Sequence, residues 1–301
     1  MIDQVGVRTK YDLVFVVTYI DQKHIGSLLK SIYDYNTVLS VLVVLVEQGG
    51  MIFDIEGYVN SNILIKKIRI QNIISLSSAR NCALNYLKKF QIQFGHIMFP
   101  DDDSIFDMEF FIKYKSVVEN DKCYLIDVFF LNSVELYRPN FFNDSQKLHR
   151  KDYPFAMSVN LIICQSIFMQ VGDFDENMGV GAIYGAAEDS DYFLRCINCG
   201  ANFYYSKQLI NFHPHYEVKY KSLSVKNLCH RFKAYGMGVE YLYCKHKMYF
   251  SAVNLLFRAI GGSLLNLFLC NFPLSLAYIY SFYYRLIVFS KKYGKLFYCN
   301  L

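Results

Sequence analysis

Three consecutive aspartates, Asp101, Asp102 and Asp103, are the residues whose types and spacing most suggest chemistry. They follow Pro100 and the strand-like segment His96–Phe99. Adjacent carboxylates repel one another, so a cation or solvent must offset their charge. Alternate aspartates can present two carboxylates to one hard divalent ion such as Mg²⁺ or Mn²⁺. The residues alone fit equally a solvated acidic turn that caps the next helix.

A second acidic pair, Glu188 and Asp189, follows the small residues Gly185–Ala187 and begins a helix-like segment, Glu188–Cys199. A carboxylate in this place could act as a general base over an acceptor hydroxyl. Ordinary capping of the helix N-terminus, where the dipole favours negative charge, explains the same residues. Both interpretations stay open from these residues alone.

A pair of histidines, His213 and His215, follows the strand-like segment Phe203–Ile210, with Pro214 between them. A histidine there could complete a metal shell or contact a phosphate. A purely structural histidine is the alternative, and the proline prevents a simple argument that both rings share one face.

Arg80 stands near the start of the helix-like segment Ser77–Phe90, which follows a strand-like run. Free backbone N–H groups at a helix start, together with an arginine, suit the binding of a diphosphate. A capped surface helix with a solvated arginine is the alternative.

The segments that must position these residues alternate between strand and helix patterns. The apolar runs Leu13–Val17 and Val41–Val46 are typical of strands buried on both faces. Alternation of this kind predicts an α/β fold with a mostly parallel sheet flanked by helices, whose ligands bind beyond the carboxyl ends of the strands. The other expected elements are a helix over His24–Tyr35, strands over Asn62–Ile68 and Tyr124–Phe130, a loop region over residues 131–157, and a strand with a short helix over Val159–Gly172.

The C-terminal segment Ala259–Tyr284 carries no charged residue over 26 positions, and about 20 apolar residues suffice to span a bilayer. Glycines, asparagines and Pro273 interrupt this segment, and basic residues flank it on both sides. We therefore expect two amphipathic or re-entrant helices, bent near Asn271–Pro273, at an anionic membrane surface. A buried helical hairpin and a single transmembrane helix are the alternatives.

Composition excludes several classes of protein. Of the 301 residues, 53% are hydrophobic and 19% are charged, so the chain can bury a large core and is not disordered. The net charge of +5 is too weakly basic to indicate nucleic-acid binding. The nine cysteines form no compact framework and are expected to be reduced thiols, and the chain start lacks the pattern of a cleaved secretory signal.

In their order along the chain, these features resemble family 2 glycosyltransferases with the GT-A fold, over roughly residues 11–245. In that family the DxD-type motif corresponds to Asp101-Asp102-Asp103. The other matching segments are Thr18-Tyr19, Ala79-Arg80-Asn81, Phe174-Asp175-Glu176, Gly179-Val180-Gly181-Ala182, Glu188-Asp189, His213-Pro214, and Arg231 with Tyr235-Gly236-Met237-Gly238. Two positions depart from the family pattern, because Ile20 replaces a frequent asparagine and Glu47-Gln48-Gly49 replaces a frequent base-holding aspartate.

The resemblance implies an inverting, metal-dependent transfer from a nucleotide-sugar, for which a UDP-sugar is expected. Mn²⁺ or Mg²⁺ would bind Asp101, Asp103 and His213, with His215 as the second choice of histidine. Asp189 would take the proton from the acceptor hydroxyl, with Glu188 as the alternate base. The residues expected to contact the donor are Thr18, Tyr19, Glu47, Arg80, Asp101 and Asp102.

The nearest resemblance is to bacterial enzymes of capsule, O-antigen or exopolysaccharide assembly. Such a role implies a lipid-linked saccharide acceptor and a place at the cytoplasmic face of the membrane, with no nucleic-acid partner. The expected domains are a GT-A catalytic domain over residues 1–247 and a hydrophobic, membrane-associating helical tail over residues 248–301. A non-catalytic subunit of the same fold that binds a sugar nucleotide or a polysaccharide is the alternative function.

Overall fold

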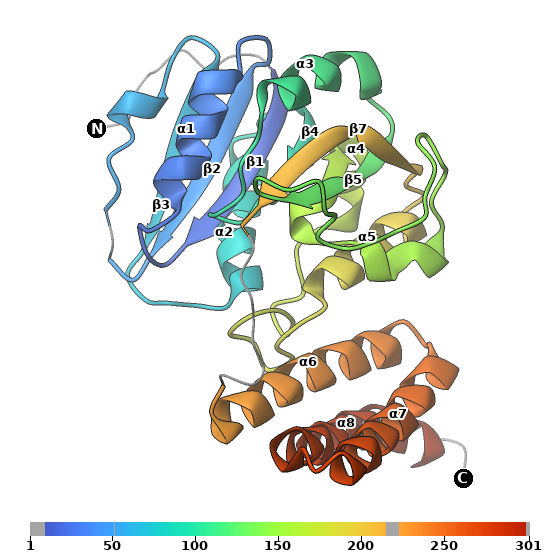
Figure 1. The fold of residues 1–301 in the computed structure, drawn as a ribbon. Helices are drawn as coiled ribbons and strands as arrows, with labels where there is room; N and C mark the ends of the chain where they lie inside the picture. The colour runs from blue at the N-terminus through green and yellow to red at the C-terminus, as the bar shows by residue number, and fades with distance from the viewer. Residues whose placement is uncertain (1–9, 51, 215–222, 299–301) are drawn as a thin grey trace. The chain divides into compact units, whose positions relative to one another are not determined.

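The computed structural model describes residues 10–50, 52–214 and 223–298 (Figure 1). These residues form two compact units. The first holds the described parts of Met1–Ile74, Ser78–Phe174 and Asp189–His215, and the second holds Ser75–Ser77, Asp175–Glu188 and the described part of Tyr216–Leu301. The expected histidine alternate His215 lies outside the described residues.

The first unit is built on a seven-stranded sheet with the strand order β3-β2-β1-β4-β6-β5-β7. Neighbouring strands are parallel except at β6, which runs antiparallel to both β4 and β5. The expected mostly parallel sheet is therefore confirmed, with one reversed strand in it. The strands are β1 (Tyr11–Tyr19), β2 (Val41–Gln48), β3 (Ile63–Ile70), β4 (Phe94–Met98), β5 (Cys123–Phe130), β6 (Leu161–Cys164) and β7 (Phe203–His213).

Helices cover both faces of this sheet, which explains the continuous apolar runs Leu13–Val17 in β1 and Val41–Val46 in β2. Alternate residues of β1 enter two separate cores. One core includes residues of α2 (Leu76–Lys89), α4 (Gln165–Val171) and α5 (Glu188–Asn198). The other includes residues of α1 (Ile25–Tyr35) and α3 (Met108–Val117), a helix that the periodicity did not single out (Figure 1).

The region expected to be a loop, residues 131–157, is mostly irregular, as predicted. It contains one short 3₁₀ segment, Arg150–Phe155, and isolated bridges that tie it to β5 and β7. Irregular backbone over a sheet edge is where substrate-binding loops of α/β proteins are found.

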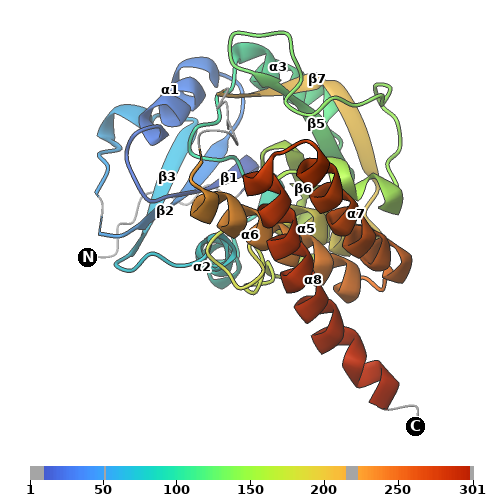
Figure 2. The same cartoon turned by 60° about the horizontal axis from the view of Figure 1, so that its bottom comes forward.

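The second unit is dominated by three helices, α6 (Val225–Lys245), α7 (Tyr249–Phe268) and α8 (Phe272–Tyr298). Helices α7 and α8 lie side by side (Figures 1 and 2). The chain reverses at Leu269–Asn271, with Cys270 in the left-handed region, and Pro273 stands in the first turn of α8. The expected bend near Asn271–Pro273 is thus present.

Both α7 and α8 are long and apolar enough to cross a membrane, by length and composition alone. Where the two helices approach, Ser263 Oγ lies 3.0 Å from Ser275 Oγ. Such small residues permit close helix contact in soluble proteins and in membranes alike. The domain boundary expected after residue 247 stays a prediction.

Candidate active site

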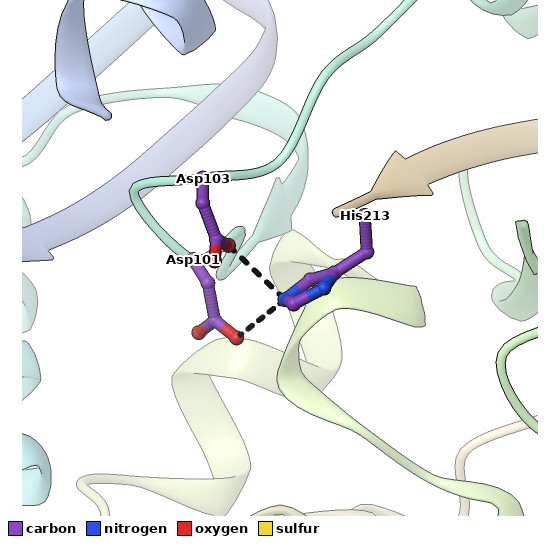
Figure 3. A group of neighbouring side chains, drawn as sticks. All are labelled: Asp101, Asp103 and His213. Atoms are coloured by element: carbon purple, nitrogen blue, oxygen red, sulfur yellow. Dashed lines mark ion pairs between the residues drawn. The ribbon is translucent and has the colours of Figure 1, made fainter. Parts of the chain in front are cut away.

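A cluster of two carboxylates and one imidazole is present beyond the carboxyl end of β4. Asp103 Oδ1 lies 3.0 Å from His213 Nε2, and Asp101 Oδ2 lies 3.8 Å from the same nitrogen (Figure 3). One ligand atom from each residue can be chosen so that all three lie within 4.8 Å of one another. The structure therefore brings together the three side chains expected to bind a metal ion.

Backbone pairing places these side chains in register. Ile105, two residues after Asp103, forms an antiparallel bridge with Phe212, the residue before His213. The N–H of each bridging residue donates to the carbonyl of the other, at 2.8 and 2.9 Å. Because this bridge fixes the loop after β4 against the end of β7, the aspartates and the histidine face one another.

The contact that Nδ1 of His213 makes with the backbone orients the ring, so that Nε2 faces the aspartates. Nδ1 lies 3.0 Å from the carbonyl oxygen of Pro214, an acceptor only, so Nδ1 carries the hydrogen of the neutral ring. Nε2 is therefore the nitrogen that faces Asp101 and Asp103, donating to them when the ring is protonated and offering a lone pair once that proton is lost. Buried histidine ligands of metal ions are commonly oriented in this way.

The charge state of His213 depends strongly on the two carboxylates. Burial lowers the pKa of His213, but the hydrogen-bonding carboxylates of Asp101 and Asp103 outweigh burial and raise it to about 10. Asp103 Oδ1 lies 3.0 Å from His213 Nε2 and is buried with no other hydrogen-bond partner among the described residues. Oxygen and imidazole donors held this way fit Mn²⁺ or Mg²⁺, with Mn²⁺ the better match to the imidazole.

Asp102, the middle aspartate, is not part of this cluster. Burial and the neighbouring charges of Asp103 and Asp101 raise the pKa of Asp102 to about 7. Three carboxylates this close together cannot all ionise freely, so one of them retains its proton near neutral pH. The expected contact of Asp102 with the donor stays a prediction.

The cluster is joined to the candidate base by Arg80, which is only 2% exposed. Arg80 Nη1 donates to Asp189 Oδ1 at 3.2 Å, and Arg80 Nη2 lies 3.7 Å from Asp101 Oδ1. The guanidinium also lies over the Phe174 ring, 5.3 Å from its centroid. A buried, rigid guanidinium therefore stands between the aspartate loop and the first turn of α5.

Asp189, the residue expected to act as the base, has a raised pKa and a partly exposed side chain. Burial raises the pKa of Asp189, the positive charge of Arg80 opposes this effect, and the charge of Asp101 adds to the rise. Its side chain keeps 22% of its surface exposed, so one edge is accessible. A carboxylate with a raised pKa and an accessible edge is suited to accept a proton near neutral pH.

Glu188, the alternate base, belongs to the second unit and is 8% exposed. It packs against the turn at Gly179, where the backbone has φ of +96° and a Cβ atom would lie 3.0 Å from Glu188 Cδ. Only glycine combines this backbone conformation with so close an approach. The structure therefore shows Glu188 held by packing, and its catalytic role stays a prediction.

Within the second unit, the segment before Glu188 is anchored on α6. Tyr184 stacks on Tyr241 with ring centroids 3.9 Å apart, and Lys245 Nζ donates to Asp175 Oδ2 at 2.7 Å. Gly238 lies against the backbone of Ala186, where a Cβ would come within 2.5 Å. Asp175 and Gly238, which belong to the segments matched in the resemblance, thus hold the chain before Glu188 against α6. The motifs alone did not reveal this structural role.

The three residues expected near the nucleoside lie at the ends of β1 and β2. Thr18 is half-buried, and Tyr19 and Glu47 are paired across the two strands. The Tyr19 hydroxyl donates to Glu47 Oε1 at 2.6 Å, and Arg69 Nε donates to Glu47 Oε2 at 2.9 Å. Lys67 lies 3.7 Å from the same carboxylate. Glu47 therefore ties three strand ends together, and its contact with a donor stays a prediction.

Sequence reasoning missed Lys67 and Arg69, because the basic residues of β3 seemed no different from other strand-edge charges. Strand register could have found Arg69, since it pairs directly with Glu47 on the neighbouring strand. Burial raises the pKa of Glu47, but hydrogen bonds from Tyr19, from the Phe53 N–H and from Arg69 outweigh burial and hold it below its usual range.

Comparisons with known proteins bear on the fold. No family model matches the chain, and no curated protein sequence matches it. The structure is similar to S. aureus TarS 1–349 in complex with UDP-GlcNAc, with a TM-score of 0.55, 14% identity, and coverage of 94% of this chain and 92% of that one.

Two further solved structures are similar. A crystal structure of S. aureus TarS gives a TM-score of 0.53 at 15% identity, with 77% of this chain covered, and this chain spans 40% of it. GalNAc-T7 with UDP, GalNAc and Mn²⁺ gives 0.51 at 14% identity, covering 79% of this chain and 50% of that one. At these identities the likeness concerns the fold alone, and the chain has the expected GT-A fold.

We expect Glu47→Gln to lower the free energy of unfolding at pH 7 by about 2 kcal/mol, because two basic side chains lose their buried partner. Since the pKa of Glu47 is lowered in the folded state, its stabilisation is present above about pH 4.3 and is lost as the pH falls through the lowered folded value. Chemical denaturation at pH 7 and at acidic pH measures both effects. The exposed Glu56→Gln is the matched control, expected to change stability by less than about 0.5 kcal/mol; equal losses in the two variants would contradict the assignment.

We expect Mn²⁺ binding to release a proton from His213, because its pKa of about 10 keeps it protonated at neutral pH. The apparent affinity for Mn²⁺ should then rise about tenfold per pH unit near neutrality. Calorimetry in buffers of different ionisation enthalpy counts the protons released. His213→Gln should bind Mn²⁺ more weakly and release fewer protons; an unchanged proton count in that variant contradicts the role of His213.

Proposed function

We propose that this chain is an inverting, metal-dependent glycosyltransferase of family 2 type. It moves a sugar from a nucleotide-sugar, with a UDP-sugar as the proposed donor, to a lipid-linked saccharide during assembly of a bacterial surface polysaccharide. The observation that carries the proposal is the joining of the Asp101–Asp103–His213 cluster to Asp189 through Arg80. TarS with bound UDP-GlcNAc, and GalNAc-T7 with UDP, GalNAc and Mn²⁺, support the donor class and the ion.

The acidic cluster and Arg80 would act on the leaving group. Asp101, Asp103 and His213 would hold Mn²⁺ or Mg²⁺, which when bound supplies positive charge against the departing diphosphate. Arg80 adds a fixed guanidinium beside Asp101, so positive charge is present before the reaction begins. Groups that need not reorganise as charge develops give the largest electrostatic benefit.

Asp189 would act on the acceptor. Its accessible carboxylate oxygen would take the proton of the acceptor hydroxyl while the hydroxyl oxygen attacks the anomeric carbon. The bond from that carbon to the departing nucleoside diphosphate breaks in the same step, so the configuration is inverted. Arg80 opposes the effect of burial on Asp189, because its positive charge lowers the pKa that burial raises. Its exposed edge would be the part of the carboxylate that meets the acceptor.

The tail would keep the enzyme at the cytoplasmic face of the membrane. Apolar residues spaced three or four apart form a continuous exposed stripe on each helix, which we call the apolar face. Its members are Phe250, Val253, Phe257, Ile260, Leu264 and Phe268 on α7, and Phe272, Leu276, Ile279, Tyr283 and Leu286 on α8. Stripes of this width on soluble helices are normally covered, and a bilayer surface is the cover that the flanking basic residues favour.

A screen of donor hydrolysis tests the proposed reaction class. UDP-, GDP- and dTDP-sugars are each incubated with the protein, with and without Mn²⁺, and free sugar is measured. We expect hydrolysis of at least one donor that depends on Mn²⁺. The alternative function, a non-catalytic subunit that binds a sugar nucleotide or a polysaccharide, predicts binding without turnover.

We expect Asp189→Asn to lower the transfer rate by about 10²- to 10⁴-fold while donor binding is kept, because the amide cannot accept the proton but still accepts a bond from Arg80. Product formation and donor calorimetry measure the two effects. Glu188→Gln is the matched control and should retain most activity. Turnover near the original rate in Asp189→Asn, with loss in Glu188→Gln, would assign the base to Glu188 instead.

We expect the paired change Phe257→Gln and Ile279→Gln to weaken partition onto anionic vesicles by about tenfold or more, because both side chains belong to the apolar face. Vesicle sedimentation measures the bound fraction. Val134→Gln with Phe141→Gln is the matched pair, since both residues are exposed apolar side chains of the first unit. Equal retention of the two pairs on vesicles rejects the apolar face as the anchor.

A further inference from the structure

A cavity of about 580 Å³ lies within the second unit, among α6, α7 and α8. One arginine from each helix lines it, namely Arg231, Arg258 and Arg285, and no acidic side chain is among the described residues of its lining. Guanidinium groups stay charged at every physiological pH. Three of them gathered around one hollow repel one another unless an anion is present.

The innermost arginine, Arg285, is held in place by close helix packing. Gly236 on α6 approaches α8 so closely that a Cβ would lie 2.5 Å from Ser281 Oγ and 3.2 Å from Arg285 Nε. Arg285 Nε donates to that serine hydroxyl at 3.1 Å. The side chain of Arg285 is therefore packed directly against α6 and oriented by its bond to Ser281.

One end of Arg285 lacks a hydrogen-bond acceptor among the described residues. Its Nη1 is buried without such a partner, and the nearest recorded carboxylate oxygen, Glu240 Oε2, is 3.8 Å away. Burying an unsatisfied donor of a charged group is costly, and structures seldom leave one without a reason. Glu240 is not part of the cavity lining, so the charged side chains that line the cavity are the three arginines.

The rest of the cavity wall is apolar or aromatic, including Phe232, Tyr235, Leu255 and Tyr278. Such a wall suits the carbon atoms next to an anionic group better than a fully hydrated small anion. The two helices that contribute Arg258 and Arg285 also carry the apolar face. Positive charge, apolar wall and exposed apolar helices thus occur in the same helical unit.

We propose that this cavity binds the phosphate headgroup of an anionic membrane lipid while the apolar face of α7 and α8 lies in the surrounding acyl region. Arginine forks match phosphate oxygens in geometry and charge. The inference rests on the proposed membrane association of the tail and is independent of glycosyl transfer. It adds recognition of a particular headgroup chemistry to what would otherwise be general attraction to negative charge.

Sedimentation with two kinds of vesicle tests this inference on the full chain. Phosphatidylcholine vesicles contain either phosphatidic acid, with a terminal phosphate, or phosphatidylserine, at matched surface charge. We expect tighter binding to the phosphatidic acid vesicles. The paired change Arg231→Gln and Arg258→Gln should reduce that preference about tenfold, the loss of one charge-assisted hydrogen bond.

The matched control is Lys226→Gln with Lys291→Gln, which removes the same charge from exposed positions of the same unit outside the cavity. It should weaken binding to both vesicles and leave the preference intact. A second variant, Gly261→Leu, fills the cavity without changing charge, since a Cβ on Gly261 meets nothing within 4 Å. It should also reduce the preference.

Three outcomes overturn the inference. The wild-type chain shows no preference between the vesicles, or the lysine pair loses the preference as much as the arginine pair, or inorganic diphosphate binds tightly in calorimetry while no vesicle preference exists. The last result would assign the arginines to a soluble phosphate. Failure to bind either vesicle would reject membrane association itself, and a negative donor screen with intact vesicle preference would reject only the transferase.

Discussion

The buried guanidinium of Arg80 is the constraint on which the candidate active site depends. It contacts Asp189 and lies near Asp101, residues that arrive on different elements of the first unit. An arginine with 2% exposure is tolerable only when carboxylates compensate its charge, and each carboxylate in turn needs the arginine. The contact that holds Arg80 beside Asp189 also acts on the pKa of that carboxyl, because the positive charge opposes the rise that burial causes.

A second, backbone constraint supports the first. The bridge between Ile105 and Phe212 brings the loop after β4 to the end of β7, and this places Asp103 beside His213. Side chains alone would not hold two aspartates so close to each other, because their charges repel. The backbone bridge opposes that repulsion, and the carboxylates raise the pKa of His213, in a cluster whose ligand atoms are close enough together to hold one metal ion.

In the second unit, too, close packing fixes the position of a charged side chain. Gly236 and Gly262 let helices approach within the reach of single side chains, with Gly262 lying against the ring of Tyr278. Close approach fixes Arg285 at the wall of a cavity instead of leaving it at a surface. Arginine therefore appears in two settings among the described residues: between carboxylates at Arg80, and on the lining of a cavity among α6, α7 and α8.

The sequence by itself determined the elements and the candidate residues. Continuous apolar runs such as Leu13–Val17 predicted strands buried on both faces, and the polar residues after them predicted a site at one edge of the sheet. The sequence also predicted the bend near Pro273, because proline and asparagine restrict the backbone conformation of the residues next to them. Each of these features depends on neighbours a few residues apart.

Only the tertiary structure decided which of those residues meet. Arg80 and Asp189 are 109 positions apart, and Glu47 finds Arg69 only through the register of β2 and β3. The reversed strand β6 between β4 and β5, and the cavity among three helices, likewise leave no periodic trace. Side-chain periodicity reports which face of an element is buried, whereas pairing across the chain depends on strand order and helix approach, which are set by the packing of the whole unit.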